Sequence, residues 1–182
     1  MLFNRHKHLE GLHAPFGASQ SSWLRYDDEK MQRVYKKKQA AAMGTRYHAW
    51  AKETIDLGIK QAKSKKTLCA YVNDAIGYKM STEVVLYYSD YFFGTVDAIS
   101  FKNKFLRIHD LKTGEEPAGM EQLEIYAALF CLEYSIKPEE IDMELRIYQN
   151  DEVLYHIPAA EDIRQIMDAI VYKNKLLENM EV

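Results

Sequence analysis

The chain has 182 residues, of which 47% are hydrophobic and 28% are charged, and its formal net charge is −3 at pH 7. This length and balance are typical of a globular protein, so we predict a single domain over residues 1–182. The net charge excludes a globally basic nucleic-acid-binding protein, although a local basic patch still sets the field in its own groove.

The first half of the chain is predicted to be helical after an irregular segment at residues 1–17, where glycine and proline recur. The predicted helices are a short one carrying Trp23 and Leu24, one capped by Asp27 or Asp28, one over residues 44–66 capped by Thr45, and a weaker one over residues 67–80. The apolar face predicted for the helix over 44–66 comprises Tyr47, Trp50, Ala51, Ile55 and Ile59.

The second half is rich in Val, Ile, Phe and Tyr, and Ser-Asp, Lys-Asn and Asn-Asp turns divide it. The predicted elements are antiparallel strands over 81–90, 91–103 and 104–114, a helix over 119–136, two strands over 141–149 and 152–158, and a final helix over 160–179. This order predicts an α/β (α+β) fold in which helices flank a central mixed β-sheet.

Cysteine content and hydropathy exclude further classes of protein. Two cysteines, Cys69 and Cys131, cannot supply the four ligands of a Cys₄ zinc site or of an iron–sulfur cluster. No stretch approaches the length of a membrane span, and the first residues lack the apolar core of a signal peptide. We therefore expect a cytoplasmic protein with no membrane partner.

Two acids and a lysine interrupt the predicted hairpin over residues 91–114. Asp110 and Lys112 share one face of the second strand, whereas His109 points to the opposite face. If the strands pair around the Lys-Asn-Lys turn, Asp97 lies opposite Asp110. Two carboxylates so placed repel each other, and a divalent cation such as Mg²⁺ removes that repulsion.

Lys112 would then lie where it can activate a metal-bound water or stabilise charge on a phosphate. Alternatively, an Asp-x-Lys sequence on a strand is a solvated salt bridge that contributes little to stability. Gly94 before Asp97 and Gly114 after Lys112 favour the first interpretation, because small residues let a ligand or another backbone approach closely.

These residues resemble the PD-(D/E)XK nuclease superfamily, specifically its RecB-like branch, which includes phage-type exonucleases. The resemblance covers roughly residues 17–135, and its motifs follow one another in order. The motifs are FGASQSSWLRY, GTRYHAWAKE, GTVDAI, IHDLKTG and EQLEIYA. Many members of this branch also carry four cysteines that bind an iron–sulfur cluster, which this chain lacks, so we expect no such cluster here.

The resemblance implies a restriction-endonuclease-like core and a role for each matched residue. His48, Asp97, Asp110 and the backbone carbonyl of Leu111 would hold Mg²⁺ or Mn²⁺. The catalytic residues would be Asp97, Asp110, Lys112, Gln122 and Tyr126. Gln122 and Tyr126 lie four residues apart on the predicted helix and so share a face. Glu83 precedes these motifs, and its part in the metal site stays open.

Basic and aromatic residues near the matched histidine are candidates for contact with DNA. Trp23, Arg25, Arg46 and Tyr47 would form a cationic and aromatic wall for a single strand or a frayed end. The lysine runs at residues 36–38 and 60–66 are either phosphate contacts or solvated helix ends.

The sequence thus predicts a divalent-metal-dependent DNA nuclease. The resemblance implies an exonuclease of DNA recombination, repair or phage DNA processing in a bacterial or phage-infected cell. The implied partners are duplex ends or single-stranded DNA, a single-strand annealing or recombination protein, and further copies of the chain. The alternatives are an endonuclease of the same fold and a catalytically silent module that binds nucleic acid or a protein.

Overall fold

The computed structural model describes residues 14–18, 21–114 and 117–180. The chain divides into two compact units, Met1–Met43 and Gly44–Val182, and each is described here by itself. Of the segment predicted to be irregular, residues 1–13 lie outside the described part, and residues 14–17 contain a turn without helix or strand. Whether the whole chain forms a single domain stays a prediction.

The Met1–Met43 unit contains the short helix η2, Ser21–Arg25, and the first part of α1, Asp28–Asp56. The indole N–H of Trp23 donates to the carbonyl of Gly17, with 3.1 Å between nitrogen and oxygen. The carboxylate of Asp27 accepts from the backbone N–H of Lys30 at 2.7 Å, so Asp27 caps α1 as predicted.

Helix α1 corrects two boundaries predicted from the sequence. It runs without a break through Gly44 and Thr45, so Thr45 does not cap a second helix. The helix also ends at Asp56, and the segment predicted to be helical as far as residue 66 includes Gly58 at φ +67°. Of the predicted apolar face, only Ala51 and Ile55 are buried, while Tyr47, Trp50 and Ile59 are exposed.

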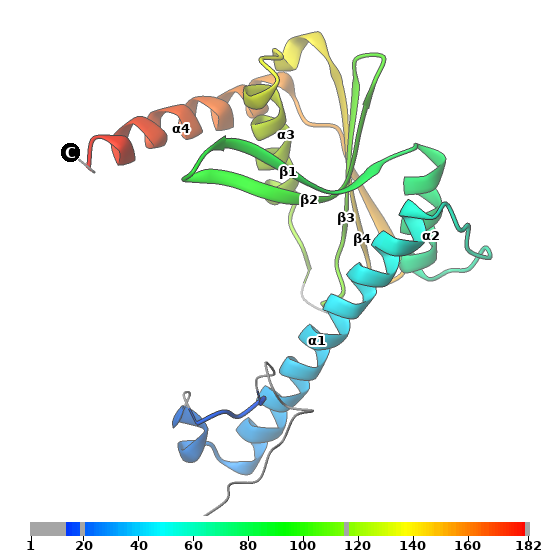
Figure 1. Cartoon of the computed structure of the whole chain (residues 1–182), viewed down its shortest axis with the longest axis vertical. Helices are drawn as coiled ribbons and strands as arrows, with labels where there is room; N and C mark the ends of the chain where they lie inside the picture. The colour runs from blue at the N-terminus through cyan, green and yellow to red at the C-terminus, as the bar shows by residue number, and fades with distance from the viewer. Residues whose placement is uncertain (1–13, 19–20, 115–116, 181–182) are drawn as a thin grey trace, which may run out of the picture. The chain divides into compact units, whose positions relative to one another are not determined.

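The Gly44–Val182 unit is built on one five-stranded sheet of order β1-β2-β3-β4-β5 (Figure 1). Its elements are α2 Thr67–Gly77, β1 Ser81–Ser89, β2 Phe92–Lys102, β3 Phe105–Leu111, α3 Glu121–Glu133, η3 Pro138–Glu140, β4 Asp142–Gln149, β5 Glu152–His156 and α4 Ala160–Glu178. Strands β3 and β4 are parallel, and the other neighbours are antiparallel. The predicted mixed sheet flanked by helices, and hence the α+β fold class, is confirmed.

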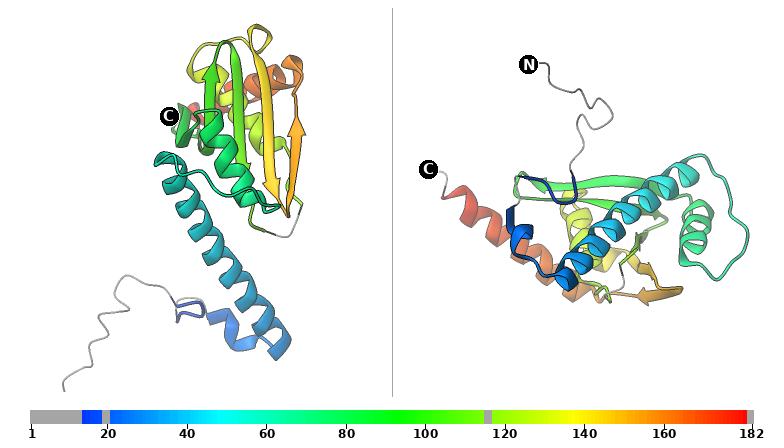
Figure 2. Two further views of the ribbon diagram at one scale, coloured as in Figure 1. Left: turned by 90° about the vertical axis from the view of Figure 1, so that its right-hand side faces the viewer. Right: turned by 90° about the horizontal axis from the view of Figure 1, so that it is seen from below.

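Helices cover both faces of the sheet, with α2 on one face and α3 and α4 on the other (Figure 2). The core on the α3 side includes Val96, Ile108 and Leu123. The core on the α2 side includes Ala98, Leu111 and Tyr148, together with Ala51 and Ile55 from the end of α1. Within the part of the chain that the structure describes, no helix is both long and apolar enough to cross a membrane.

Two tight turns fix the strand registers. Asn103 and Lys104 in the β2–β3 turn have φ of 52° and 60°, and Asn150 and Asp151 in the β4–β5 turn have φ of 50° and 61°. Two successive residues with positive φ make a two-residue hairpin turn that matches the twist of the strands. Both hairpins were predicted at these turns, and both predictions are confirmed.

Candidate active site

The β2–β3 ladder brings the two predicted acids to one place. Ala98 pairs with His109 in this ladder, so one further step along it sets Asp97 opposite Asp110. The backbone N–H of Leu111 donates to Asp97 Oδ2 at 2.9 Å and holds that carboxylate against the end of β3. Asp110 is only 4% exposed, which puts a charge-bearing group at the margin of the core.

Lys112 joins these acids to helix α3. Its ammonium lies 3.0 Å from Asp110 Oδ2 and donates to Gln122 Oε1 at 2.7 Å. The Gln122 amide in turn donates to the hydroxyl of Tyr126 at 2.9 Å. Lys112 lies one residue beyond the end of β3, where its N–H continues the ladder by donating to the Tyr148 carbonyl at 2.9 Å. The predicted grouping of Asp110, Lys112, Gln122 and Tyr126 is therefore present.

Two glycines allow helices to approach this site closely. A Cβ on Gly94 would lie 2.7 Å from Cε1 of Tyr126, so this strand position has room for the ring only as glycine. A Cβ on Gly44 would lie 2.5 Å from Oγ1 of Thr113. Gly44 is one helical turn before His48, so its close contact sets the helix face that carries the histidine.

His48 completes the group from α1. Its Nδ1 lies 3.4 Å from Asp97 Oδ2, and the side chain is about one-third exposed. The hydrogen bond with Asp97 raises the pKa of His48, and the negative charge of Asp110 adds to this effect. The histidine, which only the family resemblance had selected, thus lies beside the first acid.

Burial raises the pKa of Asp110, and the negative charge of Asp97 raises it further. The ammonium of Lys112 and the imidazole of His48 act in the opposite direction without cancelling the shift. Keeping Asp110 ionised in the folded protein therefore costs free energy, which a cation placed against both carboxylates would recover.

Among the described residues, no group of three or more His, Cys, Asp and Glu side chains is already arranged to hold a metal ion. The candidate metal ligands instead lie in two separate pairs: His48 with Asp97, and Asp110 with the ammonium of Lys112. Asp110 Oδ2 is buried and accepts no hydrogen bond of standard geometry, although the ammonium is close. Carboxylate oxygens whose negative charge is incompletely neutralised are suitable ligands for Mg²⁺ or Mn²⁺. The Leu111 carbonyl stays a predicted ligand.

Glu83 lies on β1, next to Asp97 in the β1–β2 register, because its neighbours Thr82 and Val84 pair with Ala98 and Val96. It is exposed, and its φ of 48° is unusual for a residue inside a strand. No residue type in the sequence signals this backbone conformation, and the part of Glu83 in the metal site stays open.

The strand alternation predicted from the sequence breaks at the same place. Strict alternation would put Val96 and Ile99 on opposite faces of β2, yet both pack in the α3-side core, whereas Ala98 packs on the α2 side. His109, by contrast, points away from the acids as predicted. It is fully buried against Tyr148, whose hydroxyl lies 3.2 Å from His109 Nδ1.

The residues predicted to contact DNA fall in different units. Trp23 and Arg25 belong to Met1–Met43, and Arg46 and Tyr47 belong to Gly44–Val182, so the proposed wall of four residues stays a prediction. Arg46 and Tyr47 are exposed. A cavity of about 380 Å³ adjoins the site, and its lining includes Tyr47, Lys66, Lys112 and Asn150. The sequence had selected Tyr47 for DNA contact, had left the lysine run that ends at Lys66 open between phosphate contacts and a solvated helix end, and had not selected Thr113, which also lines this cavity.

Comparison of the chain with protein-family models, with curated proteins and with solved structures finds no match. The resemblance to RecB-like nucleases therefore depends on the motif residues alone.

We expect Asp110→Asn to raise the melting temperature of the metal-free protein at neutral pH. The raised pKa means that the folded state binds a proton on Asp110 more readily than the unfolded state does. Wild-type stability contributed by this group is therefore highest below the unfolded pKa and falls as pH rises through the folded pKa. Thermal unfolding in EDTA from about pH 4, near the pKa of an unfolded aspartate, to neutral pH measures this slope.

The asparagine variant should show a smaller loss of stability over that range. His48 contributes a slope of the same sign, because its pKa is also raised, and it is retained in both proteins. Asp142→Asn, at an exposed position, serves as the matched control. Equal slopes in all three proteins would contradict the electrostatic account of Asp110.

Proposed function

We propose that this chain is a divalent-metal-dependent DNA nuclease that acts as an exonuclease. The observation that carries the proposal is the convergence on the end of β3 of Asp97, Asp110 and Lys112 with His48 from α1 and Gln122 from α3. Phosphodiester hydrolysis needs anionic oxygen ligands for a metal ion beside a cation that can lie near the attacked phosphate.

In this proposal Asp97, Asp110 and His48 hold Mg²⁺ or Mn²⁺. Such an ion would act as a Lewis acid and would lower the pKa of a water molecule toward neutrality. Lys112 places its ammonium where negative charge grows on the phosphate. Gln122 and Tyr126 orient that ammonium through the chain of hydrogen bonds from Lys112 Nζ to the tyrosine hydroxyl.

The cavity lined by Tyr47 and Lys66 would receive the DNA strand next to Lys112. An aromatic ring and an ammonium in one cavity suit a nucleotide, because the base stacks and the phosphate is neutralised. Without a metal ion the carboxylates repel the phosphate backbone, so we expect metal to strengthen DNA binding as well as to permit cleavage. The pathway, in recombination, repair or phage DNA processing, is proposed from the resemblance alone.

Digestion of end-labelled linear DNA and of closed circular DNA, with Mg²⁺ and with EDTA, tests the function. An exonuclease should shorten the linear substrate progressively in Mg²⁺ and leave the circle intact. Cutting of the circle would replace the exonuclease proposal with an endonuclease of the same fold. The absence of cleavage of either substrate in Mg²⁺ and in Mn²⁺ would overturn the nuclease proposal.

Mg²⁺ should also raise the melting temperature of the wild-type protein, because a ligand that binds only the folded state stabilises it. At a free concentration one hundred times the dissociation constant, this stabilisation is about 2.7 kcal/mol. Asp110→Asn should lose most of this shift, whereas Asp142→Asn should keep it. A shift of equal size in both variants would place the metal away from Asp110.

A catalytically silent binding module is the second candidate, and one observation favours it. Lys112 already pairs with Asp110, and no ready-made metal cluster exists among the described residues. Such a module would bind DNA equally well with Mg²⁺ and with EDTA and would cut neither substrate. The nuclease is preferred because both acids, the lysine and its glutamine partner are all retained at one place.

A further inference from the structure

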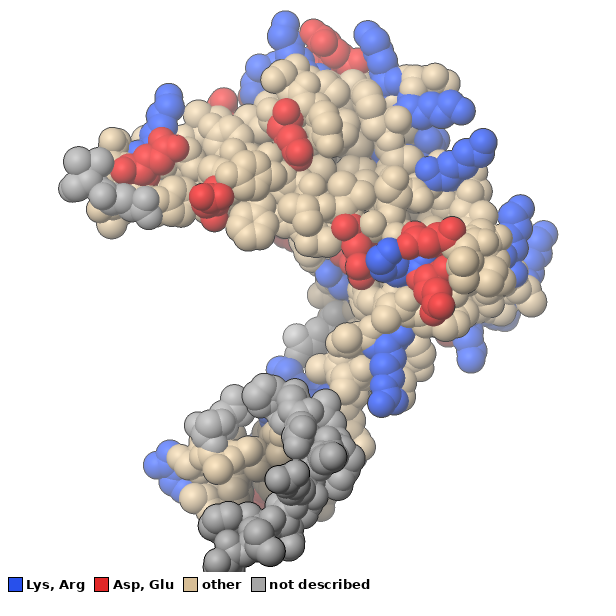
Figure 3. All heavy atoms as spheres, viewed as in Figure 1, with Lys and Arg blue, Asp and Glu red and all other residues tan. Residues whose placement is uncertain are grey.

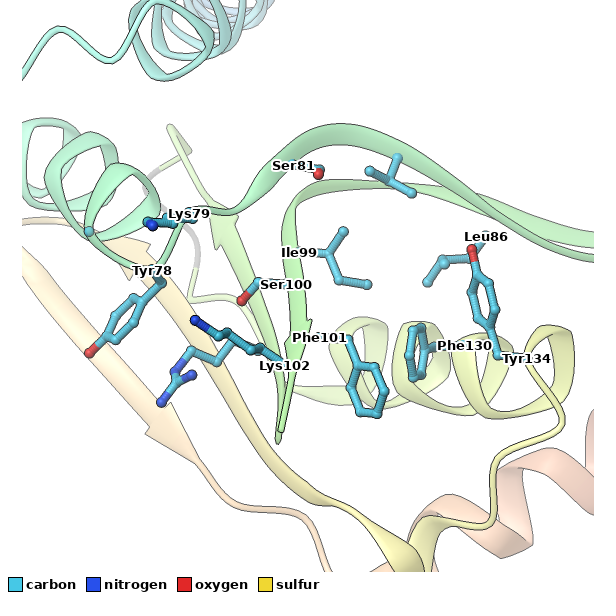
Figure 4. A pocket seen from close by; sticks show the side chains of 13 residues that line it. Tyr78, Lys79, Ser81, Leu86, Ile99, Ser100, Phe101, Lys102, Phe130 and Tyr134 are labelled. Carbon is cyan, nitrogen blue, oxygen red and sulfur yellow. The ribbon is translucent and has the colours of Figure 1, made fainter. Parts of the chain in front are cut away.

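A second cavity opens at the free edge of β2, away from the acids (Figure 4). The β1–β2 ladder begins with Ser81 opposite Ile99, so the last residues of β2 extend beyond the start of β1. In the described part of the chain, these residues pair with β3 on one side and with no strand on the other. The cavity that fills this place has a volume of about 560 Å³, which is within the size range of small-molecule sites.

The lining of this cavity, which we call the edge pocket, is positively charged. It includes Lys79, Lys102 and Arg107 and contains no Asp or Glu. Arg107 lies 3.4 Å from Glu144, so part of its charge is already neutralised. Within the described residues Lys79 and Lys102 have no ion-pair partner. Figure 3 shows Lys and Arg side chains gathered along the side of this unit that runs from the β2–β3 turn toward α2.

Aromatic rings form another wall of the edge pocket. The Phe101 and Phe130 ring centroids are 5.1 Å apart, and those of Phe130 and Tyr134 are 4.9 Å apart. Phe130 is buried, whereas Phe101 is 42% exposed and Tyr134 is 53% exposed, so two outer rings rest on an anchored inner one. Figure 4 shows these rings and the Lys102 side chain around the same opening.

We propose that the edge pocket binds a nucleoside phosphate. The base would stack on Phe101 and Tyr134, and Lys79 and Lys102 would neutralise the phosphate, because stacking and backbone neutralisation together are how proteins hold single-stranded nucleotides. An apolar peptide is a poorer fit, because it would leave two lysines facing it without a partner. The source of the ligand is either a DNA strand or a free nucleotide.

The edge pocket does not depend on the proposed cleavage chemistry, since none of its lining residues belongs to the Asp110 site. Lys102 is nevertheless on the same strand as Asp97, five residues along it, which is a rise of about 16 Å. A nucleotide in the pocket and a phosphate at Lys112 would therefore be different residues of one substrate strand.

Fluorescence anisotropy of a short end-labelled oligothymidylate tests the pocket on the full chain in EDTA, where no cleavage occurs. Lys79→Gln with Lys102→Gln should reduce the slope of log affinity against log salt concentration by about 1.4 relative to wild type, because two contacts with single-strand phosphates are lost. The matched control is Lys173→Gln with Lys175→Gln, which removes the same charge from exposed positions on α4. An equal reduction of the salt dependence in the two double variants would overturn the proposal.

Stacking is tested by Tyr134→Ala, which should weaken oligonucleotide binding by about tenfold. Tyr172→Ala is the control, because Tyr172 is an exposed tyrosine on α4. Circular dichroism and thermal unfolding verify that each variant is folded. Unchanged affinity in folded Tyr134→Ala would overturn the assignment of the aromatic wall.

Competition distinguishes the source of the ligand. Displacement of the oligonucleotide by thymidine monophosphate shows that the pocket accepts a free nucleotide, and binding of the oligonucleotide alone shows that it holds a strand. Either result supports the proposal, provided that Lys79→Gln with Lys102→Gln weakens binding of the oligonucleotide. Displacement by inorganic phosphate as effective as by the nucleotide would overturn it, since the rings would then play no part. The two proposals can fail independently. Cleavage without binding in the edge pocket would overturn only the pocket, and binding in the edge pocket without cleavage would overturn only the nuclease.

Discussion

Asp110→Asn and Lys112→Ala are each expected to slow DNA cleavage by roughly 10²- to 10⁴-fold, the range measured for loss of a positioned acid, base or charge-stabilising group. Asparagine keeps the shape of the buried Asp110 side chain and removes the charge that would hold a metal ion. Alanine at position 112 removes the ammonium that lies between Asp110 and Gln122.

The two variants should differ in their response to metal. Asp110→Asn should need far more Mg²⁺ for its residual activity, whereas Lys112→Ala should keep a Mg²⁺-induced rise in melting temperature because the carboxylates remain. Asp142→Asn and Lys173→Ala change exposed residues of the same types and should cleave at the wild-type rate. Full activity in either folded site variant would remove that residue from the mechanism.

Gly44→Leu is expected to reduce cleavage by about 10²-fold while the sheet stays folded, because a displacement of catalytic groups by about 1 Å can have an effect of this size. A Cβ at this position would meet Oγ1 of Thr113 at 2.5 Å, so Thr113 or α1 must shift, and the larger leucine side chain favours a shift of α1 away from the end of β3. His48 is one turn further along α1 and would move with it.

Helix propensity alone predicts that Gly44→Ala stabilises α1 and so does not disturb the site. Alanine is favoured over glycine in a helix interior by about 1 kcal/mol, so the substitution would stabilise α1 if the site were open. We expect Gly44→Ala to lower activity nonetheless, and Gly44→Ala with Thr113→Ala to restore it, because the second change removes the hydroxyl that the new methyl group meets. Such rescue is a coupling that independent sites do not show.

Ala49→Leu is the control for position 44, because it adds the larger side chain at an exposed position of the same helix. It should leave cleavage unchanged. A loss of activity in Ala49→Leu equal to that in Gly44→Leu, or no recovery in the double variant, would contradict the role assigned to the contact between Gly44 and Thr113.

Local chemistry explains which parts of the fold were predictable. The β2–β3 and β4–β5 hairpins follow from turns whose residues tolerate positive φ, and their register follows from the turn position. That register sets Asp97 opposite Asp110. The i, i+4 spacing of Gln122 and Tyr126 likewise predicted two side chains on one helix face, and they share a hydrogen bond.

The errors arose where a distant contact overrides a local signal. Gly44 and Thr45 look like the start of a helix, yet α1 passes through them. Gly44 instead lies where a Cβ would meet Oγ1 of Thr113, a residue far along the chain, and no local pattern reveals that contact. The conformation of Glu83 and the break in alternation near Asp97 have no local signature either.

The sequence by itself determined the order of the strands and of the α-helices after residue 66, the two hairpin registers and the residue types gathered at the end of β3, because turn conformation and side-chain periodicity act over a few neighbouring residues. The tertiary structure alone decided that Lys112 binds Gln122, that His48 reaches Asp97 and that the edge of β2 opens into a basic and aromatic pocket. These contacts join residues far apart in the chain, and their geometry depends on how whole helices pack on the sheet.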